Sequence, residues 1–470
     1  MKYLKYMIIF STVLSTACSN WLDVSPGMEK EKKDALSSQE GIRKVLIGAY
    51  IRMKTEKLYG KEMTYGFTEC LAQHWQSTSN TSLSGYLKKY DYKAKLVEDM
   101  AGDIFNNLYK VIADVNGLLA DDGIDAHKDV LEADNYELIK GEALAVRAFC
   151  HFDLLRLFGP MPNKVPAGQI LPYVTVVSKN PNTMHSWEEF TSCLLKDLNE
   201  AEKYFEKTDP ICNLSLEKLN NPASTVEDRF MYYRQMRMNY YAVCALKARI
   251  YLWMGDKKQA LKYAKTVMTA KDKEGKPMYR LGNSNDVANL DYTLSSEHIL
   301  NLNVYNLEST LGSSKEYQMS KNELFTYFYE KGTTDIRFTN LWEEVTEEYY
   351  KKHYLKKYRQ TERMPEMAKN SIPLIRLYEM YLIAMECGDL AEADVLYKDM
   401  CIARNMPQVD IKSTEQLNKI LILEYNKEFY GEGQAFYAYK RLGVEDIFYT
   451  TEKGSVDTYI VPLPLQERRD

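Results

Sequence analysis

The chain lacks the short motifs that mark common catalytic centres. Its 470 residues contain no HExxH zinc motif, no GxSxG nucleophile turn, no Walker phosphate loop and no glycine-rich dinucleotide turn. Gly431-Glu432-Gly433 lacks the third glycine of a dinucleotide turn and follows no expected strand. The six histidines are scattered, so no metal-binding cluster is evident. We therefore expect a protein without catalytic residues, metal or cofactor.

The carboxylates are the one group of residues that could still form a catalytic centre. A glycoside hydrolase needs two carboxylates that face one cleft, and the many aspartates and glutamates leave such a pair open. The glutamates at positions 343–348 are most simply the solvated face of a helix. A surface glycosidase therefore stays an alternative to a protein that only binds its ligand.

Cysteines are few and show no metal or redox spacing. The chain has eight, none in a CxxC pair, and an odd number remains after Cys18. An exported protein could form disulfides, and one pair is possible. The pattern favours small buried hydrophobic side chains instead. The seven are Cys70, Cys150, Cys193, Cys212, Cys244, Cys387 and Cys401.

The N-terminus has an apolar run too short to cross a bilayer as a stable helix. Lys2 and Lys5 give a positive start, an apolar run follows over 7–14, and small residues lead to Cys18. This pattern predicts a lipoprotein signal peptide over 1–17 and acylation of Cys18, which would anchor the protein to a membrane. Ser15 stands where a lipoprotein signal usually has leucine. An ordinary cleaved signal and a first core helix are the alternatives.

There is no excess of basic residues. Lys and Arg number 61 against 66 Asp and Glu, for a net charge of −5, so the electrostatic signature of a nucleic-acid-binding protein is missing. The run 349–358 interleaves lysines with tyrosines, an arrangement that can hold a nucleic acid backbone. In an exported acidic protein a solvated strand or helix edge is favoured. We expect no nucleic-acid partner.

Helical periodicity is what the sequence has in abundance. Residues 141–162 carry one broad apolar stripe and end at Gly159-Pro160, which predicts a long buried helix with a firm stop. Arg147 lies inside it and needs a partner or an exit to water. The stripe consists of Ala145, Ala148, Phe149, Phe152, Leu155 and Phe158.

Two segments repeat a helix–turn–helix pattern. Residues 248–260 contain Gly255-Asp256 and residues 381–393 contain Gly388-Asp389, each between helical stretches, as in tetratricopeptide repeats. Other parts of the chain show single elements. We expect further helices over 38–53, 103–120, 186–205 and 417–442, the last with a break at Gly431-Glu432-Gly433. We also expect a short strand over 171–177 and an aromatic-bearing loop over 65–92.

A series of motifs runs along nearly the whole mature chain. They are Cys18 with 22–26 (LDVSP), then 109–116 (YKVIADVN), 142–162, 245–264, 335–338 (DIRF), 372–382 (IPLIRLYEMYL), 423–441 and 461–467. In this order they resemble the SusD/RagB family of outer-membrane nutrient-binding lipoproteins, and the order is more specific than any one motif. Phe105, Gln434 and Tyr437-Ala438 depart from the family pattern, which affects local packing.

The resemblance implies a mostly α fold, in which four tetratricopeptide-like helix pairs form a superhelical scaffold with irregular loop-rich regions and a few short strands. A SusD-like domain would span 18–470, with the scaffold over about 36–270 and 371–445 and a loop-rich insert over about 272–370.

The resemblance also implies a function. Such a protein binds a nutrient oligomer at the cell surface, a glycan or in some relatives a peptide. It then delivers the oligomer to a TonB-dependent transporter barrel of the SusC type. It is lipid-anchored in the outer membrane and faces the cell exterior. A helical-repeat adaptor for proteins would fit the repeats but not the export signal.

The candidate ligand-binding residues lie in two regions. Residues 73–80 combine aromatic rings with amides and hydroxyls, which suits the apolar faces and hydroxyls of a sugar. A second set of aromatics lies over 292–342. The family resemblance implies that the binding aromatics come from comparable early and middle loops. Trp75 packing in the core is the main alternative, and Trp342 is expected on a helix. The candidates are His74, Trp75, Asn80, Tyr86, Tyr305 and Trp342.

Overall fold

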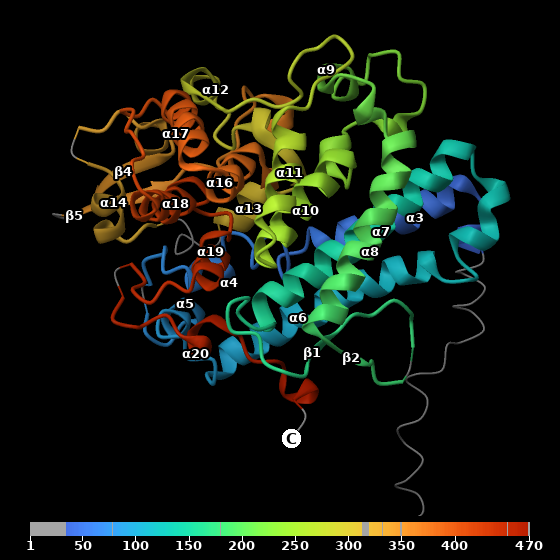
Figure 1. Ribbon diagram of the computed structural model, residues 1–470, viewed down its shortest axis with the longest axis horizontal. Helices are drawn as coiled ribbons and strands as arrows, with labels where there is room; N and C mark the ends of the chain where they lie inside the picture. The colour runs from blue at the N-terminus through green and yellow to red at the C-terminus, as the bar shows by residue number, and fades with distance from the viewer. Residues whose placement is uncertain are drawn as a thin grey trace, which may run out of the picture.

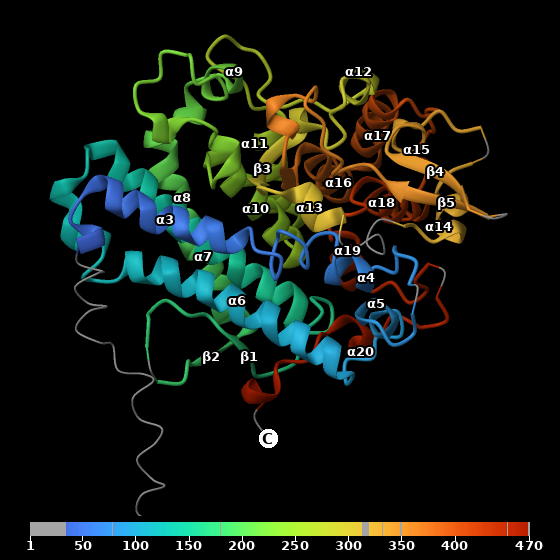
Figure 2. The same cartoon turned by 180° about the vertical axis from the view of Figure 1, so that it is seen from behind.

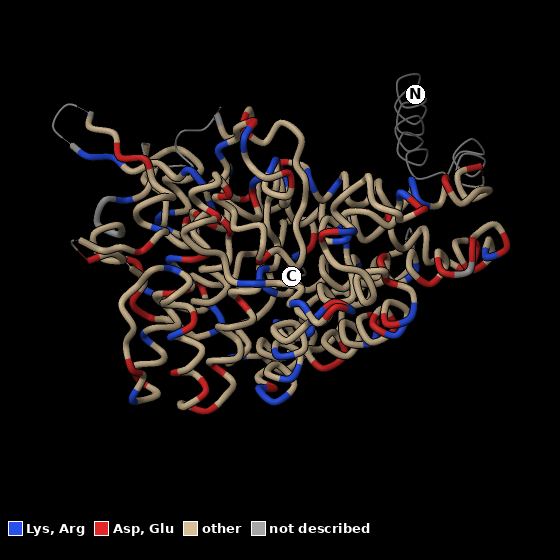
Figure 3. The backbone as a smooth tube through the Cα atoms, turned by 90° about the horizontal axis from the view of Figure 1, so that it is seen from above, with Lys and Arg blue, Asp and Glu red and all other residues tan. Residues whose placement is uncertain are grey.

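Helices make up most of the computed structural model, which describes residues 34–468 except 78, 179, 313–318, 331, 348–349 and 449. The fold is mostly α, as the sequence predicts. The expected signal peptide and Cys18 lie outside the described residues. Among the described helices, none combines the length and the apolar character needed to cross a membrane. Lysine, arginine, aspartate and glutamate are interspersed along the chain (Figure 3).

The long helices pack in antiparallel pairs. The N-terminal pairs lie on one side of the molecule and the last pair on the other, with α10 and α11 between them (Figures 1 and 2). The pairs are α3 (Gln39–Met53) with α6 (Lys95–Leu119), α7 (Ala133–Phe158) with α8 (Trp187–Thr208), α10 (Tyr240–Trp253) with α11 (Lys257–Met268), and α16 (Leu377–Cys387) with α17 (Leu390–Arg404).

Helix α7 is the buried helix that the apolar stripe predicts, although it begins earlier, at Ala133. All six stripe residues are buried. Its other faces are buried too, because α7 packs against both α6 and α8. The guanidinium of Arg147 has a partner inside the protein: Nε and Nη2 each lie 2.7 Å from the carboxylate of Asp197 on α8, and Nη1 donates to Asn116 over 3.0 Å. The helix ends where the Gly159 amide donates to the Leu155 carbonyl.

Both predicted helix–turn–helix units are present, and an aspartate caps the second helix of each. The side chain of Asp256 accepts from the amide of Gln259 at the start of α11, and that of Asp389 accepts from Glu392 at the start of α17. Gly255 has a φ of +82°, a conformation that favours glycine. Ser38 and Ser186 likewise cap α3 and α8.

The expected break in the helical stretch over 417–442 is present, and it separates α18 (Thr414–Glu428) from α19 (Ala435–Leu442). Gly431 and Gly433 separate them with φ values of +79° and +70°. A Cβ on Gly433 would lie 2.4 Å from Thr68 Oγ1, so no larger residue fits. The amides of both glycines donate to the buried carboxylate of Glu69, at 2.7 and 2.9 Å. The Gly-Glu-Gly segment therefore binds a carboxylate of the chain itself.

The short strands form antiparallel pairs: β1 (Gln169–Pro172) with β2 (Met184–Ser186), β3 (His298–Asn303) with β6 (Ser371–Arg376), and β4 (Trp342–Glu347) with β5 (Tyr350–Leu355). The expectation of a helix at Trp342 and the following glutamates is wrong. Trp342 pairs with Leu355, and Glu343 and Glu344 follow it in the same strand with exposed side chains, while Glu348 lies outside the described residues.

Short helices fill the remaining connections. They are α4 (Phe67–Leu71), α5 (Leu83–Leu87), α9 (Leu216–Leu219), α12 (Ser284–Ala288), α13 (Leu307–Gly312), α14 (Asn322–Phe328), α15 (Ile336–Thr339) and α20 (Val456–Tyr459). The 3₁₀ turns are Ile124–Val130, Pro210–Cys212, Arg229–Met231, Arg234–Met236, Ser295–Glu297, Glu366–Ala368 and Leu465–Glu467. The seven described cysteines are free thiols, buried or half-buried.

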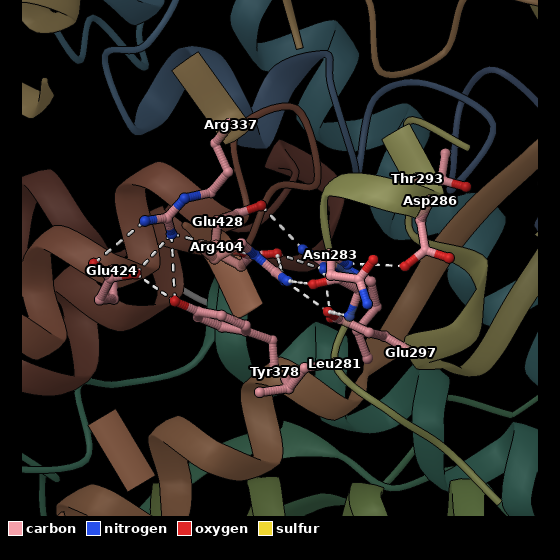
Figure 4. A network of polar contacts seen from close by, with 12 residues as sticks. Leu281, Asn283, Asp286, Thr293, Glu297, Arg337, Tyr378, Arg404, Glu424 and Glu428 are labelled. Carbon is pink, nitrogen blue, oxygen red and sulfur yellow. Dashed lines mark hydrogen bonds and ion pairs between the residues drawn. The ribbon is translucent and has the colours of Figure 1, made fainter. Parts of the chain in front are cut away.

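A buried network of ion pairs, which we call the arginine network, joins the scaffold helices to the segments between them (Figure 4). Its centre is Glu428 at the end of α18. Arg376 and Arg404 lie 2.6 and 2.7 Å from Glu428 Oε1, and Arg337 lies 3.2 Å from Oε2. Burial by itself would raise the pKa of Glu428, but Arg404 and Arg376 hold it well below its usual range. The network therefore depends on an ionised Glu428.

Further pairs extend the arginine network in both directions. Arg376 and Arg404 share Glu297, just before β3, at 2.9 and 2.6 Å. Lys357, just after β5, lies 2.7 Å from Glu432, and Glu432 also accepts from Arg376. The network thus fixes β3, β5 and β6 relative to α17 and α18.

Two buried histidines predict how stability depends on pH. His151 Nδ1 lies 2.9 Å from the Arg147 carbonyl and its Nε2 accepts from the Val174 amide. His298 Nε2 lies 3.0 Å from the Thr293 carbonyl and its Nδ1 is 3.0 Å from the Asn301 amide. Each ring therefore has one donor and one acceptor role, as a neutral imidazole does. Burial lowers the pKa of both histidines to about 3.

We expect the free energy of unfolding to fall as the pH drops below about 6.5, where histidines protonate in the unfolded chain but His151 and His298 stay neutral in the folded one. Each contributes a slope of about 1.4 kcal/mol per pH unit down to its folded pKa. Denaturant unfolding between pH 7 and 5 measures this slope. His298→Gln should remove about half of it, and an unchanged slope would contradict the assignment.

Candidate functional site

Backbone pairing joins the two loop regions in which the sequence places the ligand site. Trp75 and Ser320 form an antiparallel bridge, and the Gln76 amide donates to the Met319 carbonyl over 2.9 Å. The Ser320 amide in turn donates to the carbonyl of His353 on β5 over 3.0 Å. The early loop, residues 319–321 and the β4–β5 hairpin are therefore one continuous layer.

Tyr430, in the turn after α18, packs against the buried side of this layer. Its ring stacks on His74 with centroids 4.2 Å apart, and it meets Trp75 and Trp342 edge to face at 5.2 and 4.9 Å. The hydroxyl donates to the His74 carbonyl and lies 3.0 Å from Ser320 Oγ. Burial raises the pKa of Tyr430 well above its usual range, so the hydroxyl keeps its proton. The sequence offered no signal for this role, which depends on contacts distant along the chain.

Three of the candidate residues are buried within this layer. His74, Trp75 and Trp342 are 0%, 3% and 7% exposed. The indole of Trp75 donates to the Tyr65 carbonyl over 2.7 Å, and His74 lies between the side chains of Glu69 and Asn426. The expectation that these rings present faces to a ligand is therefore corrected. They form the buried side of the layer, which we call the floor.

Above the floor, the early loop is a compact polar turn. The hydroxyls of Ser77 and Ser82 each donate to the Ser79 carbonyl over 2.9 Å, and the Ser84 hydroxyl donates to Ser77 Oγ over 3.1 Å. Gly85 is required here, because a Cβ would lie 2.0 Å from the Ser79 carbonyl oxygen. The turn leaves Asn80 exposed.

Exposed or half-buried tyrosines lie on α5, on α14 and between β3 and α13. Tyr86 on α5 is half-buried against the core. Tyr305, between β3 and α13, is 82% exposed, and Tyr327 on α14 is 50% exposed with its ring 5.0 Å from Phe448. The sequence analysis did not single out Tyr327. We call Asn80, Tyr86, Tyr305 and Tyr327 the loop residues; they offer an amide and aromatic faces without a catalytic group.

A concave surface lies along α8. It is a groove of about 840 Å³ whose lining includes the half-buried Trp187 and, directly after α10, Met254. Its other lining residues are Glu188, Thr191, Ser192, Leu195, Lys196, Asn199, Glu200 and Lys203. Sequence reasoning missed this groove, since its residues read as the solvent face of an amphipathic helix. A ring beside hydroxyls, an amide and charges also suits a polar oligomer.

The two surfaces differ in the charged groups that they carry. The groove on α8 has the carboxylates of Glu188 and Glu200, whereas the loop residues have none. Within the ranges that the structure describes, no three His, Cys, Asp or Glu side chains are arranged to hold a metal ion. The buried carboxylate of Glu69, beneath the early loop, is engaged by His74 and by two backbone amides.

Comparison with known proteins identifies the fold. Residues 20–208 match a SusD-like family described as "Starch-binding associating with outer membrane". A SusD superfamily protein from Bacteroides thetaiotaomicron VPI-5482 is similar with a TM-score of 0.71 at 22% identity, over 91% of this chain and 97% of that one. No curated protein matches the chain.

Two other similar structures carry names that state a ligand. Surface glycan-binding protein A from Bacteroides uniformis has a TM-score of 0.66 at 17% identity, over 90% of this chain and 96% of its own. A laminarin binding SusD-like protein has a TM-score of 0.62 at 16% identity, over 92% and 97%. Residues 20–208 thus resemble the SusD-like family in sequence, and the fold over most of the chain is that of SusD superfamily structures.

Proposed function

We propose that this protein binds a glycan at the cell surface and delivers it to a partner TonB-dependent transporter in the outer membrane. The observation that carries the proposal is the ring of Tyr305, 82% exposed in a fold whose relatives include named glycan-binding proteins. A tyrosine has a flat apolar face for the C–H side of a sugar ring and a hydroxyl for its polar edge.

The ligand site in this proposal consists of the loop residues. Tyr305 provides the stacking face, Asn80 provides an amide that can both donate to and accept from sugar hydroxyls, and Tyr86 and Tyr327 extend the aromatic surface. Because the floor beneath the early loop is packed around Tyr430, the polar turn is held in place before ligand arrives. A preformed surface spends less binding free energy on ordering.

The protein is proposed to bind its ligand without converting it. The test uses the chain without its expected signal peptide and lipid anchor, which we call the soluble domain. It is purified, incubated with oligosaccharides and peptides, and the mixture is analysed by mass spectrometry. We expect oligosaccharide to be retained by the protein and recovered unchanged. Sustained product formation that one carboxylate substitution abolishes would make the protein a surface glycosidase, and retention of peptides alone would make it a peptide-binding member of the family.

Delivery requires that the protein sit at the membrane beside its transporter. We expect Cys18→Ala to move the protein from the outer-membrane fraction to the soluble fraction, because one acylated cysteine would be its anchor. Cell fractionation and immunoblotting measure this, and Ser19→Ala is the neighbouring control that should stay membrane-bound. A soluble wild-type protein would refute the anchor.

Partnership with the barrel is tested separately. Mild detergent extraction of the tagged, wild-type protein should co-purify one large outer-membrane β-barrel protein in near-equal amount. If the protein is membrane-bound but consistently isolated alone, the delivery part of the proposal fails while the binding part stands.

A further inference from the structure

A small cavity lies where α7, α10, α16 and α19 meet. Its volume is about 20 Å³, room for a single particle the size of a water molecule. Most of the side chains around it are buried, and the half-buried Gln434 and Arg441 lie at its edge. The lining residues are Arg156, Arg249, Leu252, Trp253, Glu379, Tyr425, Gln434, Tyr437, Ala438 and Arg441.

Three of these side chains have a buried polar atom without a partner among the described residues. They are Arg249 Nη1, Trp253 Nε1 and Tyr437 Oη, on residues that are 5%, 3% and 3% exposed. Arg249 is otherwise fully engaged: Nε and Nη2 lie 2.6 and 2.5 Å from the Glu379 carboxylate, and Nη2 donates to the Leu374 carbonyl. Buried polar groups in proteins are rarely left unpaired, so three around one cavity indicate a common partner.

That partner has to accept hydrogen bonds. A guanidinium and an indole can only donate. Burial raises the pKa of Tyr437 above its usual range, so its hydroxyl has a proton to donate as well. The acceptors around the cavity have partners. Both carboxylate oxygens of Glu379 bind Arg249, and the Tyr425 hydroxyl is hydrogen-bonded with Arg441. The side-chain oxygen of Gln434 accepts from Arg156 over 2.9 Å.

We propose that this cavity is a binding site for one small monatomic anion, of which chloride is the abundant cellular example. The free nitrogen of Arg249 carries two hydrogens, and the indole and hydroxyl bring one each. A water oxygen has only two lone pairs for these four hydrogens and would need acceptors for its own two. A spherical anion accepts from all of them.

The charged groups that line the cavity favour an anion over a cation, because three arginines and one carboxylate, Glu379, line it. Arg249 pairs with Glu379, and Arg156 and Arg441 pair with Asp153 and Glu386, which are not part of the lining. The bound ion would connect α10, through Arg249 and Trp253, to α19, through Tyr437. Its role would be to tie the central helix pair to the C-terminal helix, independently of glycan binding.

The test combines a crystal and a solution measurement on the soluble domain. In crystals grown with sodium bromide, we expect an anomalous bromine peak within hydrogen-bonding distance of Arg249, Trp253 and Tyr437. In solution, the melting temperature should be higher in chloride than in gluconate at the same ionic strength. A water-sized peak without anomalous signal, equal melting in both salts, or a bromide peak without chloride-dependent melting would overturn the proposal.

Variants localise the effect. Ala438→Asp places a carboxylate at the cavity wall and should remove both the bromide peak and the chloride dependence, while Val176→Asp adds the same charge at a 62% exposed position and should keep both. If Ala438→Asp does not fold, Tyr437→Phe removes one donor with little change in volume. It should weaken chloride binding by roughly threefold to tenfold, the range expected for one hydrogen bond. An unchanged chloride dependence in Tyr437→Phe would place the effect elsewhere.

Discussion

Glu428→Gln should reduce the free energy of unfolding by about 3–5 kcal/mol, the range for removing one partner of a buried ion pair. Glutamine keeps the shape of the side chain but removes the charge that Arg337, Arg376 and Arg404 share. Three guanidiniums would then face each other in the protein interior with less compensation. Denaturant unfolding of the soluble domain measures the change.

Glu415→Gln on the same helix is the matched control. Glu415 pairs with Lys419 one turn away, and both side chains are more than 70% exposed. Water screens such a pair, so this variant should unfold almost as wild type does. Equal stability of Glu428→Gln and wild type would contradict the view that the arginine network holds the strands against the scaffold.

The second large effect is expected on ligand binding. Tyr305→Ala should lower glycan affinity about tenfold to a hundredfold, by analogy with the ~1–3 kcal/mol lost when a base loses its aromatic stacking partner. Its melting temperature should hardly change, because the ring is 82% exposed and supports little of the core. Calorimetric titration with a binding glycan and a thermal melt of the same sample measure the two quantities.

Three variants make this result specific. Tyr305→Phe keeps the ring and should retain most of the affinity. Trp75→Ala should show the reverse pattern, with a large loss of stability from the cavity left in the floor, of order 3–5 kcal/mol for a buried tryptophan. Trp187→Ala tests the groove on α8. If it weakens binding while Tyr305→Ala does not, the ligand lies along α8 and the assignment to the loop residues is wrong.

Periodicity was a sound guide to the scaffold because one helix face carries enough local information. The stripe on α7 and the caps at Ser38, Ser186, Asp256 and Asp389 are all patterns within a few residues. The same reasoning failed at Trp342. Its charged neighbours suit either a helix or a hairpin, and pairing with β5 decides between them.

The candidate site was harder to predict, since its geometry depends on distant partners. In sequence, Trp75 and Trp342 resemble exposed binding aromatics, but both are buried, where they pack edge to face against Tyr430. The small cavity has a similar origin. Gln434 and Ala438, two departures from the family pattern, lie on its wall, and only the fold brings them beside Arg249.

The central proposal is that this protein binds a glycan, and direct titration of the soluble domain tests it most plainly. Laminarin and starch oligosaccharides, a wider glycan panel and a set of unrelated peptides would be titrated by calorimetry under one buffer condition. The account predicts saturable binding to at least one glycan, abolished or strongly weakened in Tyr305→Ala, and none to the peptides. Binding to peptides with no response to any glycan would contradict it.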